Sequence, residues 1–248
     1  MSGLIAFQDG GYAFLKGVFP YSQGVKALPG YAIERLRFAR PLPIAVGFRA
    51  IEAQLKARGR PRAALCAAEL RSPRPFSFGG FGAFNEGYVE VLKDWGIYRD
   101  ALNPVARSNV APEIEPPPEP CFYAFCYTVP AATPEDSFVV AGSGEWPEGG
   151  RFPEDIVARG DVSAAGLRAK AHWVCDMMQA RLAGLGMDWR SASATQIYTV
   201  HDPHPFLGEE IIARAGNGAG LTWHYCRPPI EGLEYEMDVR CVSVERTI

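Results

Sequence analysis

Apolar residues recur at helical spacing in two stretches of the first half of the chain. Val46, Ile51 and Leu55 fall at helical spacing in the segment 45–58, which Gly59 follows as a natural helix stop. The segment 81–95 carries a similar stripe of aromatic and aliphatic residues. Short or loosely alternating apolar runs predict strands at 31–38, 62–70, 106–110 and 121–129.

The second half of the chain repeats this order. Its clearest strand is 233–244, because apolar and polar residues alternate strictly through its first eight positions (LEYEMDVR), which is typical of a strand with one buried face. Helical spacing predicts helices over 163–186 and 206–214. Further strands are predicted at 138–142, 194–200 and 221–225.

A repeated turn supports an internal duplication. The segments 72–76 (SPRPF) and 202–206 (DPHPF) each follow a short apolar run that comes after an amphipathic segment. A polar, proline-containing break at 130–137 then divides the chain into units 1–130 and 131–248. We predict an α+β protein in which each unit is a mixed sheet with two helices on one face.

Composition narrows the class of protein. The 248 residues carry a formal net charge of -3 without a long basic block, so nucleic acid and anionic membrane are not expected partners. No apolar run approaches the length of a membrane span, which needs about 18 residues. The six cysteines are scattered without metal-ligand spacing, which indicates reduced, buried thiols. We therefore expect a cytoplasmic protein.

Four segments resemble motifs of the Rid family of imine deaminases, also called YjgF-like. The segment 20–26 (PYSQGVK) is similar to the family's PYSQAV motif, and 143–147 (SGEWP) is similar to SGQIP. The segment 84–90 (FNEGYVE) resembles FNEVYAE, and 104–110 (PVARSNV) resembles PARSCV. In order and spacing, the four motifs cover most of the chain as two tandem copies.

The resemblance implies chorismate-mutase-like domains that assemble as a homotrimeric barrel with sheets inside and helices outside. It also implies clefts between neighbouring units that bind small carboxylate-bearing imines. By motif match, Arg107 stands at the position of the family's carboxylate-binding arginine, Tyr21 at its pocket tyrosine, and Ser143 and Gly144 at its serine–glycine pair. Glu236 matches the glutamate of the family's last strands.

Neither copy contains a complete set of these residues. The first copy reads ARP at 39–41 where SGQ is expected, and FYA at 122–124 where the acidic strand is expected. The second copy lacks the tyrosine–serine–glutamine motif. The sequence therefore predicts a composite site between unlike copies.

Other polar residues supply weaker candidates. Glu145 follows the serine–glycine pair, and His224 lies in an aromatic run, so both are candidates for lining a substrate pocket. His201 and His204 share a proline-rich turn but have no second ligand pair, so no metal is expected. An imine is already prone to hydrolysis, so no organic cofactor is expected either. The pattern assigns no role to Arg227.

Three functions remain open at this stage. The leading hypothesis is hydrolytic deamination of a small enamine or imine carboxylic acid, and the resemblance makes a 2-aminomuconate-type intermediate of aromatic catabolism one candidate. Arg107 would hold the carboxylate, since a guanidinium fork binds it bidentately, and Glu236 or Tyr21 would move protons. The incomplete motifs leave two alternatives: a ring-opening or amide hydrolase on the same scaffold, and a protein that binds small carboxylates without turnover.

Overall fold

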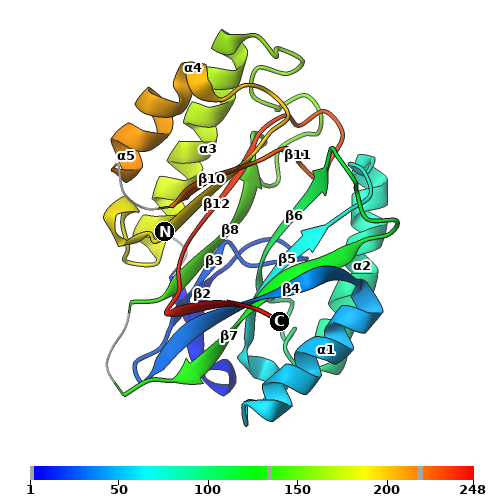
Figure 1. The fold of residues 1–248 in the computed structure, drawn as a ribbon, viewed down its shortest axis with the longest axis vertical. Coiled ribbons are helices and arrows are strands. Elements are labelled where there is room, and N and C mark those ends of the chain that lie inside the picture. The colour runs from blue at the N-terminus through cyan, green and yellow to red at the C-terminus, as the bar shows by residue number, and fades with distance from the viewer. Residues whose placement is uncertain (1–2, 133–135, 217–219) are drawn as a thin grey trace.

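The computed structural model describes residues 3–132, 136–216 and 220–248. Two mixed sheets lie face to face, with helices on their outer sides (Figure 1). The first sheet has six strands, in the order β11 (Cys226–Arg227), β6 (Ala106–Pro112), β5 (Leu65–Arg71), β7 (Cys121–Pro130), β4 (Tyr31–Pro43) and β13 (Val244–Thr247).

The second sheet has seven strands. Two successive hairpins within residues 4–27 supply three strands at one edge, and the second half of the chain supplies the others. The order is β1 (Leu4–Phe7), β2 (Tyr12–Leu15), β3 (Gly24–Ala27), β8 (Phe138–Gly144), β12 (Glu236–Cys241), β9 (Ala194–Tyr198) and β10 (Leu221–His224).

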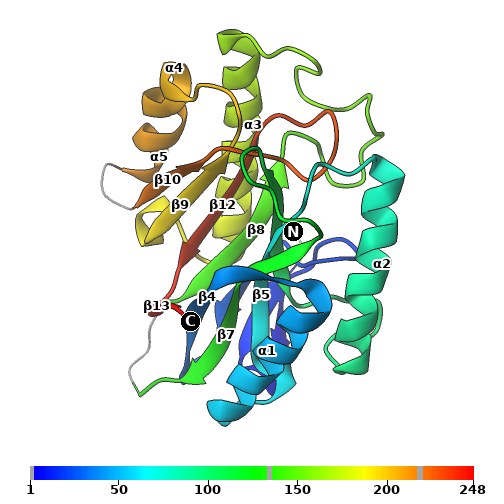
Figure 2. The same cartoon turned by 45° about the vertical axis from the view of Figure 1, so that its right-hand side comes forward.

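Each sheet buries its outer face under helices, as Figure 2 shows from a second side. Two helices, α1 (Ile44–Ala57) and α2 (Phe78–Asp94), cover the six-stranded sheet through a core that includes Ile51, Leu55 and Tyr88. The long α3 (Ala164–Gly184) covers the seven-stranded sheet. Beside α3 runs an irregular helix made of α4 (His204–Phe206), the π-helical η4 (Leu207–Ile212) and α5 (Ala213–Ala215).

The predicted mixed α+β architecture is confirmed, with corrections to three elements. The strand expected over 62–70 begins only at Leu65, because 62–64 form a 3-10 turn. The helix expected over 206–214 is π-helical in its middle. The strand expected over 233–244 with one buried face spans only Glu236–Cys241 and is buried on both faces. The chain then crosses to the other sheet and continues as β13.

The sheets exchange their terminal segments. β3 pairs with β8, so that Val25 lies opposite Val139, although the two strands are more than a hundred residues apart in sequence. In return, β13 pairs with β4 of the six-stranded sheet. The predicted division near residue 130 stays a prediction, and residues 133–135 of the expected break lie outside the described residues.

The space between the sheets is apolar at one end and polar further along. Tyr12, Phe14 and Val25 of the N-terminal hairpin pack against Ile33 and Cys66 of the facing sheet. All six cysteines are free thiols, five of them buried. Among the described residues, no helix has the length and apolar character that crossing a membrane requires.

Candidate active site

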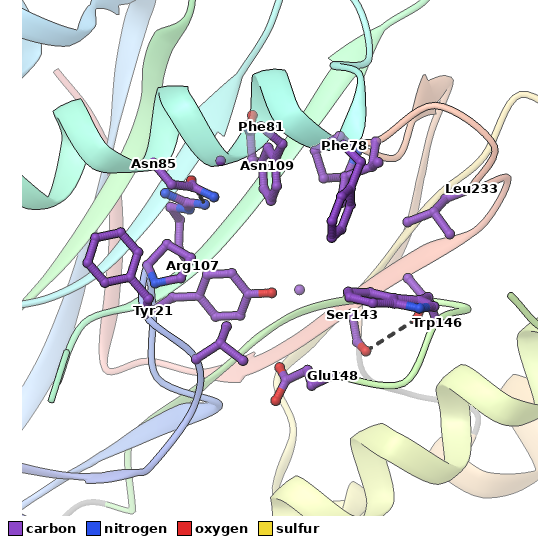
Figure 3. A pocket seen from close by; sticks show the side chains of 18 of the residues that line it. Tyr21, Phe78, Phe81, Asn85, Arg107, Asn109, Ser143, Trp146, Glu148 and Leu233 are labelled. Atoms are coloured by element: carbon purple, nitrogen blue, oxygen red, sulfur yellow. Dashed lines mark hydrogen bonds between the residues drawn. The ribbon is translucent and has the colours of Figure 1, made fainter. Parts of the chain in front are cut away.

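A cavity of about 410 Å³ opens between the two sheets beside the first turns of α2 (Figure 3). Its walls come from α2, from β6 of one sheet, and from β8 and β12 of the other. The segment 18–21 and the loop after β8 complete it. Phe78 and Trp146 meet edge to face across its rim, with ring centroids 5.7 Å apart.

The structure brings five of the predicted site residues to this cavity. They come from both sheets: Arg107 lies on β6, Ser143 and Gly144 on β8, and Glu236 on β12. Tyr21 lies on the segment that joins the sheets, because the next residue donates its backbone N–H to the carbonyl at 105 before the chain enters β3.

Arg107 is a buried guanidinium without an ion-pair partner in the described part of the chain. Its side chain is 3 % exposed, and Nη2 donates to Asn85 Oδ1 at 2.6 Å, while Nη1 has no partner. Aromatic rings surround it: the guanidinium carbon lies 4.8 Å from the centroid of Tyr88 and 5.3 Å from that of Tyr21. Burial lowers the pKa of Arg107. A buried cation of this kind is complementary to an anionic ligand.

Glu236 is buried in the opposite wall. A side chain at Gly142 would overlap its carboxyl group, so the glycine is needed for the two strands to hold the glutamate there. Burial raises the pKa of Glu236 well above its usual value, and the nearby Asp238 and Glu145 raise it further. The protonated, neutral form of this carboxyl group is therefore favoured in the folded chain, which suits it to donate a proton.

Tyr21 lies beside Arg107 in the same cavity. Burial raises the pKa of Tyr21 to about 12, with Glu148 and Glu236 acting in the same direction and Arg107 opposing them. The phenol is therefore neutral near pH 7 and acts as a hydrogen-bond donor or acceptor.

The sequence analysis missed Glu148, which also lines the cavity. Its Oε1 accepts a hydrogen bond from Arg181 Nη2 at 2.8 Å, and its Oε2 accepts one from Gln23 Nε2 at 2.8 Å. Gln23 belongs to the segment 20–26 and Glu148 follows 143–147, so two motifs far apart in sequence meet here. The only signal in the sequence was the position of Glu148 directly after the second motif.

Glu145 does not reach the cavity. Its carboxylate pairs with Lys170 Nζ at 3.2 Å, and both side chains are fully buried. It also accepts the backbone N–H groups of Glu234 and Tyr235, at 2.6 and 3.1 Å. These contacts fasten the loop after β8 to α3 and to the entry of β12, so Glu145 is placed to hold the cavity wall rather than a ligand.

Replacing Glu145 with alanine should lower the free energy of unfolding by about 3–5 kcal/mol, because it leaves the Lys170 ammonium buried without its partner. Urea unfolding monitored by circular dichroism measures this loss. Alanine in place of the exposed Glu154 is the matched control, and its effect should stay within about 0.5 kcal/mol. A Glu145→Ala variant as stable as the control would contradict this role.

His224 also lies away from the cavity. It stacks on Tyr198 with ring centroids 4.9 Å apart, and its Nε2 pairs with Gln196 Oε1 at 2.8 Å. Burial lowers the pKa of His224 to about 4, so the ring is neutral near pH 7. It borders a separate hollow between the sheets, near the buried ion pair of Arg35 and Glu69.

The remaining histidine and arginine candidates contact carboxylate groups away from the cavity. His201 Nε2 lies 2.8 Å from Glu234, and Arg227 Nε lies 2.7 Å from Glu113. His204 lies beside Asp202 in the same turn. In the described ranges, no group of three or more His, Cys, Asp or Glu side chains is arranged to hold a metal ion.

The fold resembles that of one solved structure over most of the chain. The structure of a chorismatase superposes with a TM-score of 0.55 at 12% identity, covering 92% of this chain and 79% of the other. The structure of RidA from the Antarctic bacterium Psychrobacter covers 45% of this chain and 85% of its own, with a TM-score of 0.34 and 14% identity. The first of these likenesses establishes the shared architecture.

Comparison of the sequence identifies the family, whereas the structural likeness identifies only the fold. The family model described as 2-aminomuconate deaminase CnbZ matches residues 4–246. A protein of Comamonas testosteroni named 2-amino-5-chloromuconate deaminase is 48% identical over 244 residues, which are 97% of each chain. The chain therefore belongs to the 2-aminomuconate deaminase CnbZ family. The resemblance to imine deaminases noted in the sequence is confirmed.

Proposed function

We propose that this protein hydrolytically deaminates a small enamine or imine carboxylic acid of the 2-aminomuconate type. The observation that carries the proposal is the buried guanidinium of Arg107, which faces a cavity that is also lined by Glu236, a buried carboxyl group with a raised pKa. Family membership and the name of the Comamonas relative support the same reaction class.

The reaction replaces an amino group by a carbonyl oxygen. The enamine group, C(NH2)=CH, takes a proton on its CH carbon and becomes an iminium ion. Water then adds to the iminium carbon and releases a proton, and the resulting carbinolamine loses ammonia to leave a ketone. The sum is enamine plus water giving a 2-oxo acid plus ammonia, so atoms and charge balance and no electrons are gained or lost. We therefore propose that no redox cofactor takes part.

The cavity residues fit these steps. Arg107 would fix the carboxylate next to the reacting carbon, and its surrounding aromatic rings exclude water from that ion pair. Glu236 would donate the proton, and general acid catalysis of this kind contributes about 10²- to 10⁴-fold. Ser143 and Gly144 would shape the wall opposite α2.

Glu148 is suited to orient the water molecule that attacks the substrate. The hydrogen bonds from Arg181 and Gln23 fix both of its oxygens, which keeps the carboxylate in one orientation at the cavity wall. Its remaining lone pairs can accept a hydrogen bond from a water molecule and direct that molecule at the imine carbon.

Ammonia release from freshly generated 2-aminomuconate tests the proposal. We expect a rate far above that in buffer, because enzymes accelerate reactions by about 10⁶-fold or more. No release above buffer, with a folded chain confirmed by circular dichroism, would reject the proposed function. Thermal stabilisation by carboxylates without any turnover would instead favour a binding protein.

We also propose the assembly and location that the family resemblance implies. In this proposal, units 1–130 and 131–248 act as tandem Rid-like domains, and three chains form a cytoplasmic homotrimer. Light scattering measures the mass of the assembly directly, and a stable monomer would contradict the trimer.

A further inference from the structure

Two buried donors without partners stand on one strand of the cavity wall. Arg107 Nη1 and Asn109 Nδ2 are both buried and make no hydrogen bond in the described part of the chain. They occupy alternate positions of β6 and both line the cavity, whereas Ser108 between them donates to Asp238 Oδ2 at 2.7 Å. A buried donor left unpaired costs about 1–3 kcal/mol, so a ligand that accepts from both would remove that cost.

Asn109 is held in place by its neighbours. Its Oδ1 accepts a hydrogen bond from Ser72 Oγ at 3.0 Å, and the Ser72 N–H donates to the Val110 carbonyl at 2.9 Å. Both side chains are buried. The acceptor end of the amide is therefore occupied, and the donor end is left for the cavity.

The wall beside Asn109 is open. Gly79 and Gly82 of α2 line the cavity, and a Cβ at either position would meet no atom within 4 Å. The first turn of α2, with its N-terminal amides, borders the same space and favours a negative group.

We propose that Asn109 determines specificity for dicarboxylates, by donating a hydrogen bond to the second acid group of a substrate whose first carboxylate lies on Arg107. Alternate residues of a strand are about 6.6–6.8 Å apart, which is comparable to the separation of the two acid groups in an extended six-carbon diene. The inference rests on the proposed function, because it assigns the far end of the same substrate.

Two unreactive ligands separate this role from catalysis. trans,trans-Muconate and sorbate share the same six-carbon diene, and sorbate has a methyl group in place of one carboxylate. Titration calorimetry on the full chain should show that muconate binds about 10- to 100-fold more tightly than sorbate, as a hydrogen bond to a charged group predicts. Asn109→Asp replaces the donor by an oxygen of the same shape, and Asn109→Leu removes it.

Both variants should lose the preference for muconate and keep the affinity for sorbate within about threefold. Thermal unfolding confirms that each is folded, and Asn109→Leu keeps the test open if the aspartate variant does not fold. A wild-type protein that binds neither ligand, or without preference, overturns the inference. Variants that keep the wild-type ratio of muconate to sorbate affinity also overturn it, as do variants whose affinity for both ligands falls equally. Loss of the ratio in a chain that releases no ammonia would instead reject only the proposed function.

Discussion

Replacing Arg107 with methionine should lower kcat/KM for 2-aminomuconate by about 10²- to 10³-fold, because it removes the buried partner of the substrate carboxylate. The same change should leave the free energy of unfolding equal or higher. In the absence of ligand, Arg107 is a desolvated cation without an ion pair, and methionine fills its space without that cost. Steady-state ammonia release and urea unfolding measure the two effects.

Arg71→Met is the matched control for this variant. Arg71 is also a buried arginine, with its guanidinium carbon 4.1 Å from the ring centroid of Tyr123, but it does not line the cavity. The control should change kcat/KM by only a few fold. Equal losses in the two variants would mean that Arg107 acts through general packing. An Arg107→Met enzyme with wild-type kcat/KM would remove this residue from the site.

The local pattern of apolar residues was sufficient to predict the elements that bury one face. The helix α1 carries a clear apolar stripe, and the structure has α1 and α3 within two residues of the predicted bounds. The strand β4, predicted to end at residue 38, continues to Pro43. The hairpin strands β1 to β3 were not predicted, because each has only four residues and β2 and β3 are buried on both faces. A fully buried four-residue strand shows no alternation to read.

The residues of the candidate site were also predicted only in part. Motif matching found Arg107, Tyr21, Ser143 and Glu236 because each lies within a recognisable segment. It could not distinguish Glu145, which points into the protein toward Lys170, from Glu148 three residues on, which faces the cavity. That difference depends on the course of the loop after β8, which is set by tertiary contacts and has no periodicity.

The exchange of terminal strands was equally invisible to local pattern. The motif that contains Tyr21 pairs through β3 with the strand that carries Ser143, across more than a hundred residues of sequence. A sheet register between such distant segments follows from packing of the whole chain. Ser143, Gly144 and Glu236 therefore line the cavity from one sheet, and Arg107 and Asn109 line it from the other.

Glu236→Gln is expected to separate activity from stability. Glutamine keeps the shape of the side chain but cannot deliver a proton, so kcat should fall by about 10²- to 10⁴-fold near pH 7. The wild-type kcat/KM should also fall at alkaline pH, as Glu236 ionises above its raised pKa. Ammonia release across a pH series measures both effects, and a variant that retains wild-type kcat would contradict the proton-donor role.

The free energy of unfolding of Glu236→Gln should rise, whereas its activity should fall. The unfolded glutamate has a pKa of about 4.3, whereas burial, Asp238 and Glu145 raise the folded pKa against the opposing effect of Arg71. Between these two values the folded chain binds a proton that the unfolded chain has released, so this group makes stability fall as pH rises. Glutamine cannot ionise, so Glu236→Gln removes this fall in stability with rising pH. The variant should be more stable than wild type at pH 7, and the difference in unfolding free energy should shrink toward pH 4.

Urea unfolding at a series of pH values measures this difference, and Asp238→Asn supplies the matched control. Asp238 is also buried on β12, but it hydrogen-bonds Ser108, Gln196 and Tyr198 and does not line the cavity. Its replacement removes one of the groups that raise the pKa of Glu236, so it should move the alkaline fall in kcat/KM to lower pH but should not abolish kcat. A Glu236→Gln variant that is less stable than wild type at pH 7 would mean that Glu236 is ionised in the folded protein, which is incompatible with a role as general acid.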